Sequence, residues 1–318
     1  MAPLAYIYAA GSIGSDAIDV PAMPRSSDAQ PIPLRELLRV QDIAIPRLAS
    51  RFAQLAVLGA QRCLSRLATP LPRTTRVYLG TGLGDIARTD ALYYEVMPPS
   101  SQLASPAQFA SAGNNMAAFF VAQHAALASR NLTVSLDTLS FEQALVLALD
   151  DLAANDCTTA LVGCVDETTV PREFYVRRFP LAQNHFIGEG SAWLVLGCDP
   201  ANAIGEVTLA CMLEPSADDG ALWAQRLAKE FIGTKSSARL LAGCRLRDAA
   251  IEQLRVALPD CHRADYLPSS GYFPTAAGLA LGSALVHRSQ NETTLWHINR
   301  DDAGRTGLIA IKVYGVRT

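Results

Sequence analysis

The sequence has few charged residues and no strong excess of either sign. Only 18% of its 318 residues are Asp, Glu, Lys or Arg, against about 25% in average soluble domains. The formal net charge of −3 excludes a protein that holds nucleic acid through bulk positive charge. Apolar residues make up 50%, which excludes intrinsic disorder, because disordered chains combine low hydrophobicity with high charge. So little charge also predicts that much of the surface is buried against another subunit.

Long apolar runs are also missing. No run of about 18 apolar residues occurs, so the sequence predicts no transmembrane helix. The opening MAPLAYIYAAGSIGSD has no basic segment before its apolar residues, and we therefore expect no signal peptide. Together these two absences predict a cytoplasmic protein.

The seven cysteines and five histidines form no metal-binding or disulfide pattern. The cysteines are odd in number and scattered, no CxxC occurs, and the histidines form neither HxxxH nor HExxH. We expect reduced thiols, mostly buried as small apolar side chains, and no structural zinc. No other metal and no bound cofactor is expected.

Common nucleotide-binding and hydrolase motifs are absent. The segment GTGLGD at Gly80–Asp85 follows a predicted strand, but it lacks the third glycine of a dinucleotide-binding G-x-G-x-x-G motif. A tight turn after the strand explains these glycines better. No Walker A motif and no G-x-S-x-G elbow occurs, which argues against P-loop nucleotide hydrolases and excludes an α/β-hydrolase elbow.

Strand and helix patterns alternate along the whole chain. Short apolar runs predict strands at residues 4–10, 76–80, 131–136, 159–166, 188–197, 205–212, 238–242, 293–298 and 307–314. Helical periodicity predicts helices within 34–67 and at 107–129, 140–154, 219–232, 248–257 and 275–287. Polar surface loops are expected at 16–33 and around Pro98. This alternation indicates an α/β fold with a large central sheet.

Four segments carry a more specific pattern. The longest runs from Asn115 to the turn GCVD at Gly163–Asp166, and the first is the opening LAYIYAAGSIGS. The others are HFIGEGSAWLVLG at His185–Gly197 and SSGYFPTAAGLALGSAL at Ser269–Leu285. Together, in this order, they resemble the β-ketoacyl synthase family of the thiolase superfamily. The resemblance implies a five-layer αβαβα fold of two similar halves, residues 1–203 and a shortened 204–318, in one globular unit.

The positions at which the family carries its catalytic groups differ here. By resemblance, Thr138 stands at the position of the nucleophilic Cys and Tyr272 at the position of one catalytic His. Gly243 and Cys244 lie near the position of the other His. A threonine hydroxyl has a far higher pKa than a thiol and needs a general base to attack a thioester. We therefore expect no catalytic residues in this chain.

Loss of these positions with retention of the framework is typical of a non-catalytic subunit. The resemblance is to chain-length factors, the ketosynthase β-subunits that pair with a Cys-containing ketosynthase and shape its acyl tunnel in type II polyketide biosynthesis. The short chain suits the form found in aryl polyene biosynthesis. The resemblance implies two partners, a catalytic ketosynthase and an acyl carrier protein, whose phosphopantetheine arm is a transient ligand.

Apolar side chains before and after the strand at 131–136 are candidates for the interface and the tunnel. In this fold the strand follows a helix at the dimer interface, and pairing across a two-fold axis buries roughly 2,000 Å² or more. Aromatic residues and Met are enriched in such contacts. The candidates, for which the protein's own core is the competing location, are Phe109, Asn115, Met116, Phe119, Phe120 and Phe141.

Two other functions remain open. One is an active acyltransferase or thioester hydrolase that uses Thr138 or Ser140 as its nucleophile, with Ser135 as a further hydroxyl nearby. Asp137 is the neighbouring candidate base, although a solvated turn position is the expected role of that side chain. The other function is a homodimeric acyl-binding scaffold.

Four further residues have a structural and a functional interpretation. Cys164 is expected to be a structural thiol rather than a displaced nucleophile, and Glu189 a buried, hydrogen-bonded carboxylate. Arg177 and Arg178 are expected to be a solvated pair, with contact to a carrier protein as the alternative.

Overall fold

The structure is a computed structural model that describes residues 3–14, 31–98, 103, 105–169, 171–179, 187–216, 218–231, 238–246, 248–257 and 261–316. Most of the loop predicted at 16–33 lies outside the described residues, as do His185 and Phe186 at the start of one of the four resembling segments.

All named strands of these residues belong to one hydrogen-bonded sheet in the order β3-β2-β4-β5-β1-β6-β10-β9-β7-β8. The first five strands are β1 (Ala5–Gly14), β2 (Arg76–Gly80), β3 (Asn131–Val134), β4 (Thr159–Asp166) and β5 (Gly190–Gly197). The last five are β6 (Gly205–Leu213), β7 (Ala238–Ala242), β8 (Cys261–Ala264), β9 (Thr293–Arg300) and β10 (Thr306–Val313). Read outward from the β1–β6 contact, both sets of five repeat one order, so the sheet consists of two equivalent parts.

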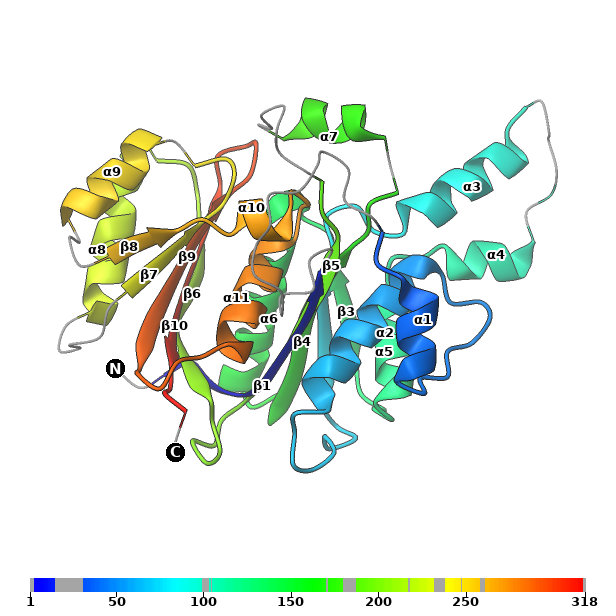
Figure 1. Cartoon of the computed structure of the whole chain (residues 1–318), viewed down its shortest axis with the longest axis horizontal. Helices are drawn as coiled ribbons and strands as arrows, with labels where there is room; N and C mark the ends of the chain where they lie inside the picture. The colour runs from blue at the N-terminus through cyan, green and yellow to red at the C-terminus, as the bar shows by residue number, and fades with distance from the viewer. Residues whose placement is uncertain are drawn as a thin grey trace.

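The helices complete five layers (Figure 1). On the outer side of the first five strands lie α2 (Arg51–Leu64) and α5 (Met116–His124), and on the outer side of the last five lie α8 (Asp219–Phe231) and α9 (Asp248–Ala257). Between the two parts of the sheet lie α6 (Ser140–Ala153) and α11 (Ala276–Val286). This is the αβαβα arrangement predicted from the sequence.

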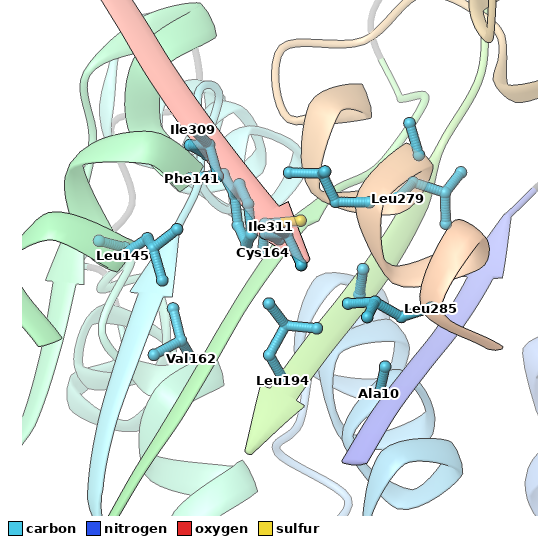
Figure 2. Close-up of a cluster of buried hydrophobic side chains, with 14 of the residues drawn as sticks. Ala10, Phe141, Leu145, Val162, Cys164, Leu194, Leu279, Leu285, Ile309 and Ile311 are labelled. Atoms are coloured by element: carbon cyan, nitrogen blue, oxygen red, sulfur yellow. The ribbon is translucent and has the colours of Figure 1, made fainter. Parts of the chain in front are cut away.

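The central layer is largely apolar because both of its helices are mostly covered by the two parts of the sheet. Figure 2 shows Phe141 and Leu145 of α6 and Leu279 and Leu285 of α11 meeting in one cluster of buried side chains. A helix that is hydrophobic all round belongs in such a position. Each fully buried Leu or Phe side chain stabilises the fold by about 1.5–3 kcal/mol.

Three predicted elements differ from the observed ones. The periodicity at 34–67 is two helices, α1 (Leu34–Val40) and α2, separated by a segment that contains Pro46, which does not fit a helix interior. The helix predicted at 107–129 is likewise α4 (Pro106–Ser111) and α5, separated by a turn around Gly113. Strand β1 continues beyond residue 10 to Gly14, paired with β5.

Four elements were not predicted from the sequence. They are the helices α3 (Ile86–Val96), α7 (Arg172–Arg178) and α10 (Leu267–Ser270) and the short strand β8. Helix α3 begins after Asp85, whose side chain accepts a hydrogen bond from the Arg88 N–H at 3.2 Å. None of the residues of α3 is buried, so this helix does not pack an apolar face against the core.

Candidate functional site

Thr138 lies in a strained turn between β3 and α6. It is the middle residue of a short 3₁₀ helix, η1 (Asp137–Leu139). Asp137 has a φ of 48°, a left-handed conformation that is rare outside glycine and is often found at functional sites. The Thr138 side chain is buried, and its hydroxyl donates a hydrogen bond to the carbonyl oxygen of Arg300 at 3.1 Å. A carbonyl oxygen cannot remove this proton, so the hydroxyl is not activated as a nucleophile.

The space beside Thr138 is almost completely filled. The cavity there has a volume of about 10 Å³, roughly the minimum that holds one water molecule. Three of the predicted positions meet at this cavity, because Tyr272 and Cys244 line it together with Thr138. The other lining residues are Phe179, Tyr266, Leu267, Phe273, Pro274, Ala276, Ala277 and Asn299. A thioester with its acyl chain does not fit in this volume.

Tyr272 and Cys244 are both uncharged near neutral pH. Burial raises the pKa of the Tyr272 phenol to about 12 and the pKa of the Cys244 thiol to about 11. A neutral phenol is not a general base, and a thiol without its thiolate form is a poor nucleophile. Gly243 precedes Cys244 and packs against Asn299, where an added Cβ atom would lie 2.1 Å from Oδ1. None of these positions supplies the chemistry of a catalytic His.

A buried polar network below Thr138 was not foreseen from the sequence. The Nε2 atom of His297 lies 2.8 Å from Oε1 of Glu142, and its Nδ1 atom lies 3.0 Å from the carbonyl oxygen of Leu241. Asn299 donates from Nδ2 to the Thr138 carbonyl oxygen at 2.6 Å and to Glu142 Oε1 at 2.9 Å. Both ring nitrogens of His297 are therefore engaged by groups other than the Thr138 hydroxyl.

This network joins the two parts of the molecule. Glu142 lies on α6, which connects β3 and β4 in the first part of the molecule. His297 and Asn299 lie on β9, in the second part. The paired side chains are 155 residues apart in the sequence, so no local pattern brings them together. The ring of His297 thus bridges a backbone carbonyl oxygen of one element and a carboxyl oxygen of another.

The glycine-rich segment Gly80–Asp85 surrounds a carboxylate of the protein itself. Asp166 accepts hydrogen bonds from the Gly82 and Leu83 N–H groups at 3.0 and 2.9 Å and from the Thr81 hydroxyl at 2.9 Å. Thr275 adds its N–H and hydroxyl at 3.1 and 2.8 Å. The N–H groups that would bind phosphate in a nucleotide site are thus already bonded, and the segment is the tight turn that the sequence predicted.

The neighbouring hydroxyls and the carboxylate also have other partners. The buried Ser140 Oγ atom accepts from the Leu136 N–H at 2.8 Å and lies 2.7 Å from the Asp137 carbonyl oxygen. Ser135 is exposed. The expectation of a solvated Asp137 is wrong, because its carboxylate is mostly buried and paired with Arg178 at 3.3 Å and Arg245 at 3.8 Å. It faces these guanidinium groups and is not placed as a base for Thr138.

Cys164 and Glu189 have structural surroundings. Cys164 is fully buried, its thiol donates to the Thr275 carbonyl oxygen at 3.6 Å, and burial raises its pKa. Glu189 accepts from the Ile32 N–H at 2.7 Å and forms a two-pronged ion pair with Arg51 at 2.5 and 2.7 Å. Neither group is available for chemistry.

The interface candidates divide into exposed and buried residues. Phe109 on α4 and Phe119 on α5 are 70% and 45% exposed, and Asn115 is exposed as well. Met116 is partly buried and Phe120 is buried, while Phe141 lies inside the central core. Only the exposed side chains are open to contact with another protein.

Large exposed apolar residues concentrate in one stretch of the chain. More than half of those in the described residues fall between positions 93 and 132, namely Tyr93, Tyr94, Val96, Met97, Leu103, Phe109, Phe119 and Leu132. They lie on and around α3, α4, α5 and β3, and Figure 1 shows α3 and α4 extending away from the sheet. We call this set the 93–132 apolar surface. Its β3 strand is at the end of the sheet, paired with β2 alone.

The described residues contain no membrane-spanning helix, no metal-binding cluster and no disulfide. No helix there combines the length and the apolar character needed to cross a membrane. No cluster of three or more His, Cys, Asp or Glu side chains that could hold a metal ion occurs in the same residues. All seven cysteines are free thiols.

Comparison with solved structures decides the fold. No protein-family model and no curated protein sequence matches the chain. Its structure aligns with "The ishigamide ketosynthase/chain length factor" at a TM-score of 0.72 and 18% identity, over 98% of this chain and 99% of that one. It aligns with a β-ketoacyl synthase from Burkholderia phymatum STM815 at a TM-score of 0.74 and 13% identity, over 99% and 100% of the two chains. The chain has the thiolase-like ketosynthase fold.

A further solved structure aligns with this chain over nearly its whole length. A complex of a type II polyketide acyl carrier protein with its ketosynthase, AntDE:AntF, aligns at a TM-score of 0.69 and 14% identity, over 98% of this chain and 100% of that one. In the present chain, Thr138, Tyr272 and Cys244 line one cavity of about 10 Å³.

Proposed function

We propose that this chain is a non-catalytic, chain-length-factor type subunit that pairs with a Cys-containing ketosynthase and shapes its acyl tunnel. The observation that supports this most is the closed cavity beside Thr138, about 10 Å³ in volume. The reaction in question is type II polyketide or fatty-acid-like chain extension, with aryl polyene biosynthesis as the narrower assignment suggested by the short sequence. The ishigamide protein and AntDE:AntF, both with the same fold, carry ketosynthase functions in their names.

The chemistry of condensation explains why the closed cavity matters. A ketosynthase needs a thiolate to carry the acyl chain and polar groups that stabilise the enolate of the incoming malonyl unit. Here the Thr138 hydroxyl donates to a backbone carbonyl, and Tyr272 is a neutral phenol in the place where a His is expected. The partner would therefore hold the acyl group and perform the condensation.

The 93–132 apolar surface is the proposed contact with the ketosynthase. Exposed apolar patches of this kind mark protein interfaces, and an edge strand offers unpaired N–H and C=O groups for sheet extension into a partner. Strand β3 and the neighbouring Phe119 and Leu132 provide both features. We accordingly expect the isolated chain to be poorly soluble.

The remaining parts of the proposal concern the carrier protein, the compartment and the two halves. An acyl carrier protein would deliver its phosphopantetheine-bound substrate to the Cys of the partner. The free thiols suit the reducing cytoplasm. We also propose residues 1–203 and 204–318 as the two halves of one unit, supported by the repeated strand order on either side of the β1–β6 contact.

The proposal is tested by co-expression with a Cys-containing ketosynthase, followed by size-exclusion chromatography and intact-mass measurement after incubation with an acyl carrier protein. We expect a one-to-one complex with the acyl adduct on the partner only. An adduct on this chain that disappears in Thr138→Ala or Ser140→Ala would instead establish the acyltransferase or hydrolase alternative. A stable homodimer that ignores the ketosynthase would establish the scaffold alternative.

A further inference from the structure

Four arginine side chains line one open pocket on the surface outside the closed cavity. The pocket has a volume of about 600 Å³, and its basic residues are Arg177, Arg178, Arg245 and Arg300. The remaining lining residues are Phe179, Asp301, Asp302, Ala303 and Gly304. Such a concentration of positive charge is unexpected in a chain whose net charge is −3. We call this feature the four-arginine pocket.

Fewer carboxylates than arginines line the described part of the pocket. Asp301 is buried, its Oδ2 atom pairs with the Arg305 guanidinium at 2.7 Å, and its Oδ1 atom accepts from the Arg305 backbone N–H at 2.8 Å. Asp137 lies between Arg178 and Arg245, and Asp302 is the other acidic lining residue. Among the described lining residues, four arginines thus stand against two aspartates, and one of these aspartates is engaged by Arg305.

Arg245 shows that the pocket is built rather than a chance gathering of surface side chains. Its side chain is only 14% exposed, and its guanidinium carbon lies 5.3 Å from the centre of the Phe179 ring. Its Nη2 atom donates to the Arg178 carbonyl oxygen, whereas its buried Nε atom has no hydrogen-bond partner within the described part of the chain. A buried N–H group of a charged side chain without a partner is costly, and a bound ion or ligand is a common explanation.

The position of the pocket limits what its ligand can do. Phe179 lines both the four-arginine pocket and the closed cavity, so it separates the two spaces. The Arg300 carbonyl oxygen on the same boundary holds the Thr138 hydroxyl. A ligand in the four-arginine pocket would lie outside the cavity that contains Thr138.

We propose that the four-arginine pocket binds the phosphate group of a small phosphorylated ligand. Guanidinium groups bind phosphate oxygens through paired, charge-assisted hydrogen bonds, and Arg is preferred over Lys for this geometry. The volume is in the range of ordinary ligand sites, roughly 300–1,000 Å³. This inference rests on the geometry of the pocket and not on the proposed function, so a chain that fails to bind a ketosynthase would leave it intact.

The test is isothermal titration of the purified full-length chain, or of its complex, with inorganic pyrophosphate. We expect saturable binding that weakens as salt is raised, because the contacts are ionic and partly exposed. Arg245→Gln is expected to weaken binding at least about tenfold, the loss of one charge-assisted contact. Arg177→Gln changes an exposed residue, so it tests the pocket even if the Arg245 variant does not fold.

The matched control is Arg255→Gln. Arg255 is exposed on α9, pairs with Glu252 at 2.8 Å and lies outside the lining of the pocket. This variant changes the net charge by the same amount, and we expect it to bind pyrophosphate as the unaltered chain does. No saturable binding, or equal weakening in Arg255→Gln and Arg177→Gln, would overturn the proposal.

The source of the phosphate is found by comparing 4′-phosphopantetheine, pantetheine and adenosine diphosphate. Tighter binding of 4′-phosphopantetheine than of the nucleotide would point to a carrier-arm or coenzyme-type ligand, and the reverse order to a nucleotide. Both results support a phosphate site. Pantetheine that binds as tightly as 4′-phosphopantetheine would contradict it, since the two differ in the phosphate alone.

Discussion

The two parts of the sheet share one strand order but differ in the connection between their second and third strands. Between β2 and β3 the chain builds α3, α4 and α5, and it exposes the aromatic side chains Tyr94 and Phe109. The equivalent connection from β7 to β8 is short and contains α9. The edge strands differ as well, since β3 carries Leu132 at its surface while β8 exposes His262 and Arg263.

The two end strands of the sheet, β3 and β8, therefore differ in the side chains that they expose. Charged residues on an edge strand discourage pairing with another chain, whereas an apolar edge flanked by aromatic side chains favours it. The edge of the second part therefore has charged side chains that disfavour pairing, whereas the edge of the first part has the apolar character that favours it. The duplicated framework provides the layers, and the connection at 81–130 carries most of the exposed apolar side chains that we propose as the contact surface.

The largest expected effect is a loss of stability when the buried polar network between the two parts of the sheet is disrupted. Glu142→Ala removes the oxygen acceptors of His297 and Asn299, and breaking a buried pair in this way costs about 3–5 kcal/mol of unfolding free energy. Urea denaturation measures the loss. The control is Glu252→Ala, which removes an exposed pair with Arg255 and should change stability by less than about 1 kcal/mol. Equal effects of the two substitutions would refute a cross-link between the parts.

A somewhat smaller effect is expected at the contact surface. Phe119→Lys on α5 should weaken binding to the ketosynthase by about 30-fold, as for the loss of an aromatic anchor worth about 2 kcal/mol. Val256→Lys places the same charge on α9, the equivalent helix of the second part, where the side chain is 73% exposed. Surface plasmon resonance should find that the Val256 variant binds normally. A partner that loses affinity for both variants would place the contact elsewhere.

Glu167, in the first part of the molecule, predicts that the stability of the fold depends on pH. Burial, with the nearby Asp85 charge, raises the pKa of Glu167 to about 7, although Arg51 lies 3.5 Å away and favours the ionised form. A carboxyl group whose pKa is higher in the folded state destabilises the fold as it ionises, so stability should fall between about pH 4.5 and 7. Glu167→Gln should remove roughly 1–3 kcal/mol of that fall.

The measurement for Glu167 is thermal denaturation from pH 5 to pH 8. Above pH 7 the Gln variant should be the more stable protein, and near pH 5 the two should be similar. A variant that is less stable than the unaltered chain at pH 8 would show that the charged form of Glu167 is the one that stabilises the fold.

The smallest expected effect is at the cavity itself. Thr138→Cys restores a thiol at the nucleophile position, yet we expect no acyl adduct by intact-mass measurement, because the 10 Å³ cavity excludes the substrate. Thr138→Cys combined with Tyr272→His tests whether the phenol is the obstacle. Acylation of the single variant would show that the cavity opens in solution and would weaken the case for a non-catalytic subunit.

The sequence predicted the elements whose periodicity reflects burial. β2 and β4 have the predicted bounds because their apolar runs are buried on both faces. Helix α11 is apolar all round, and α6 is apolar over most of its surface. Helix α3 was missed because none of its residues is buried. The break between α4 and α5 depends on a turn at Gly113 rather than on periodicity.

The site was predictable only in part. The resemblance brought Thr138, Tyr272 and Cys244 into consideration, and the structure places them at one cavity. The pairing of Glu142 with His297 depends on the packing of α6 against β9, which no short-range pattern encodes. The closure of the cavity depends on side-chain volumes from several elements and likewise appears only in three dimensions.

Strand β6 lies between the first strand, β1, and the last strand, β10, and this brings the two ends of the fold close together. Gly205 of β6 lies opposite Ile7 of β1 on one side and opposite Val313 of β10 on the other. The first and last strands are thus two inter-strand spacings apart, about 10 Å. A short linker between the present ends, with a new start before β6, would give a circular permutant that keeps every strand pairing.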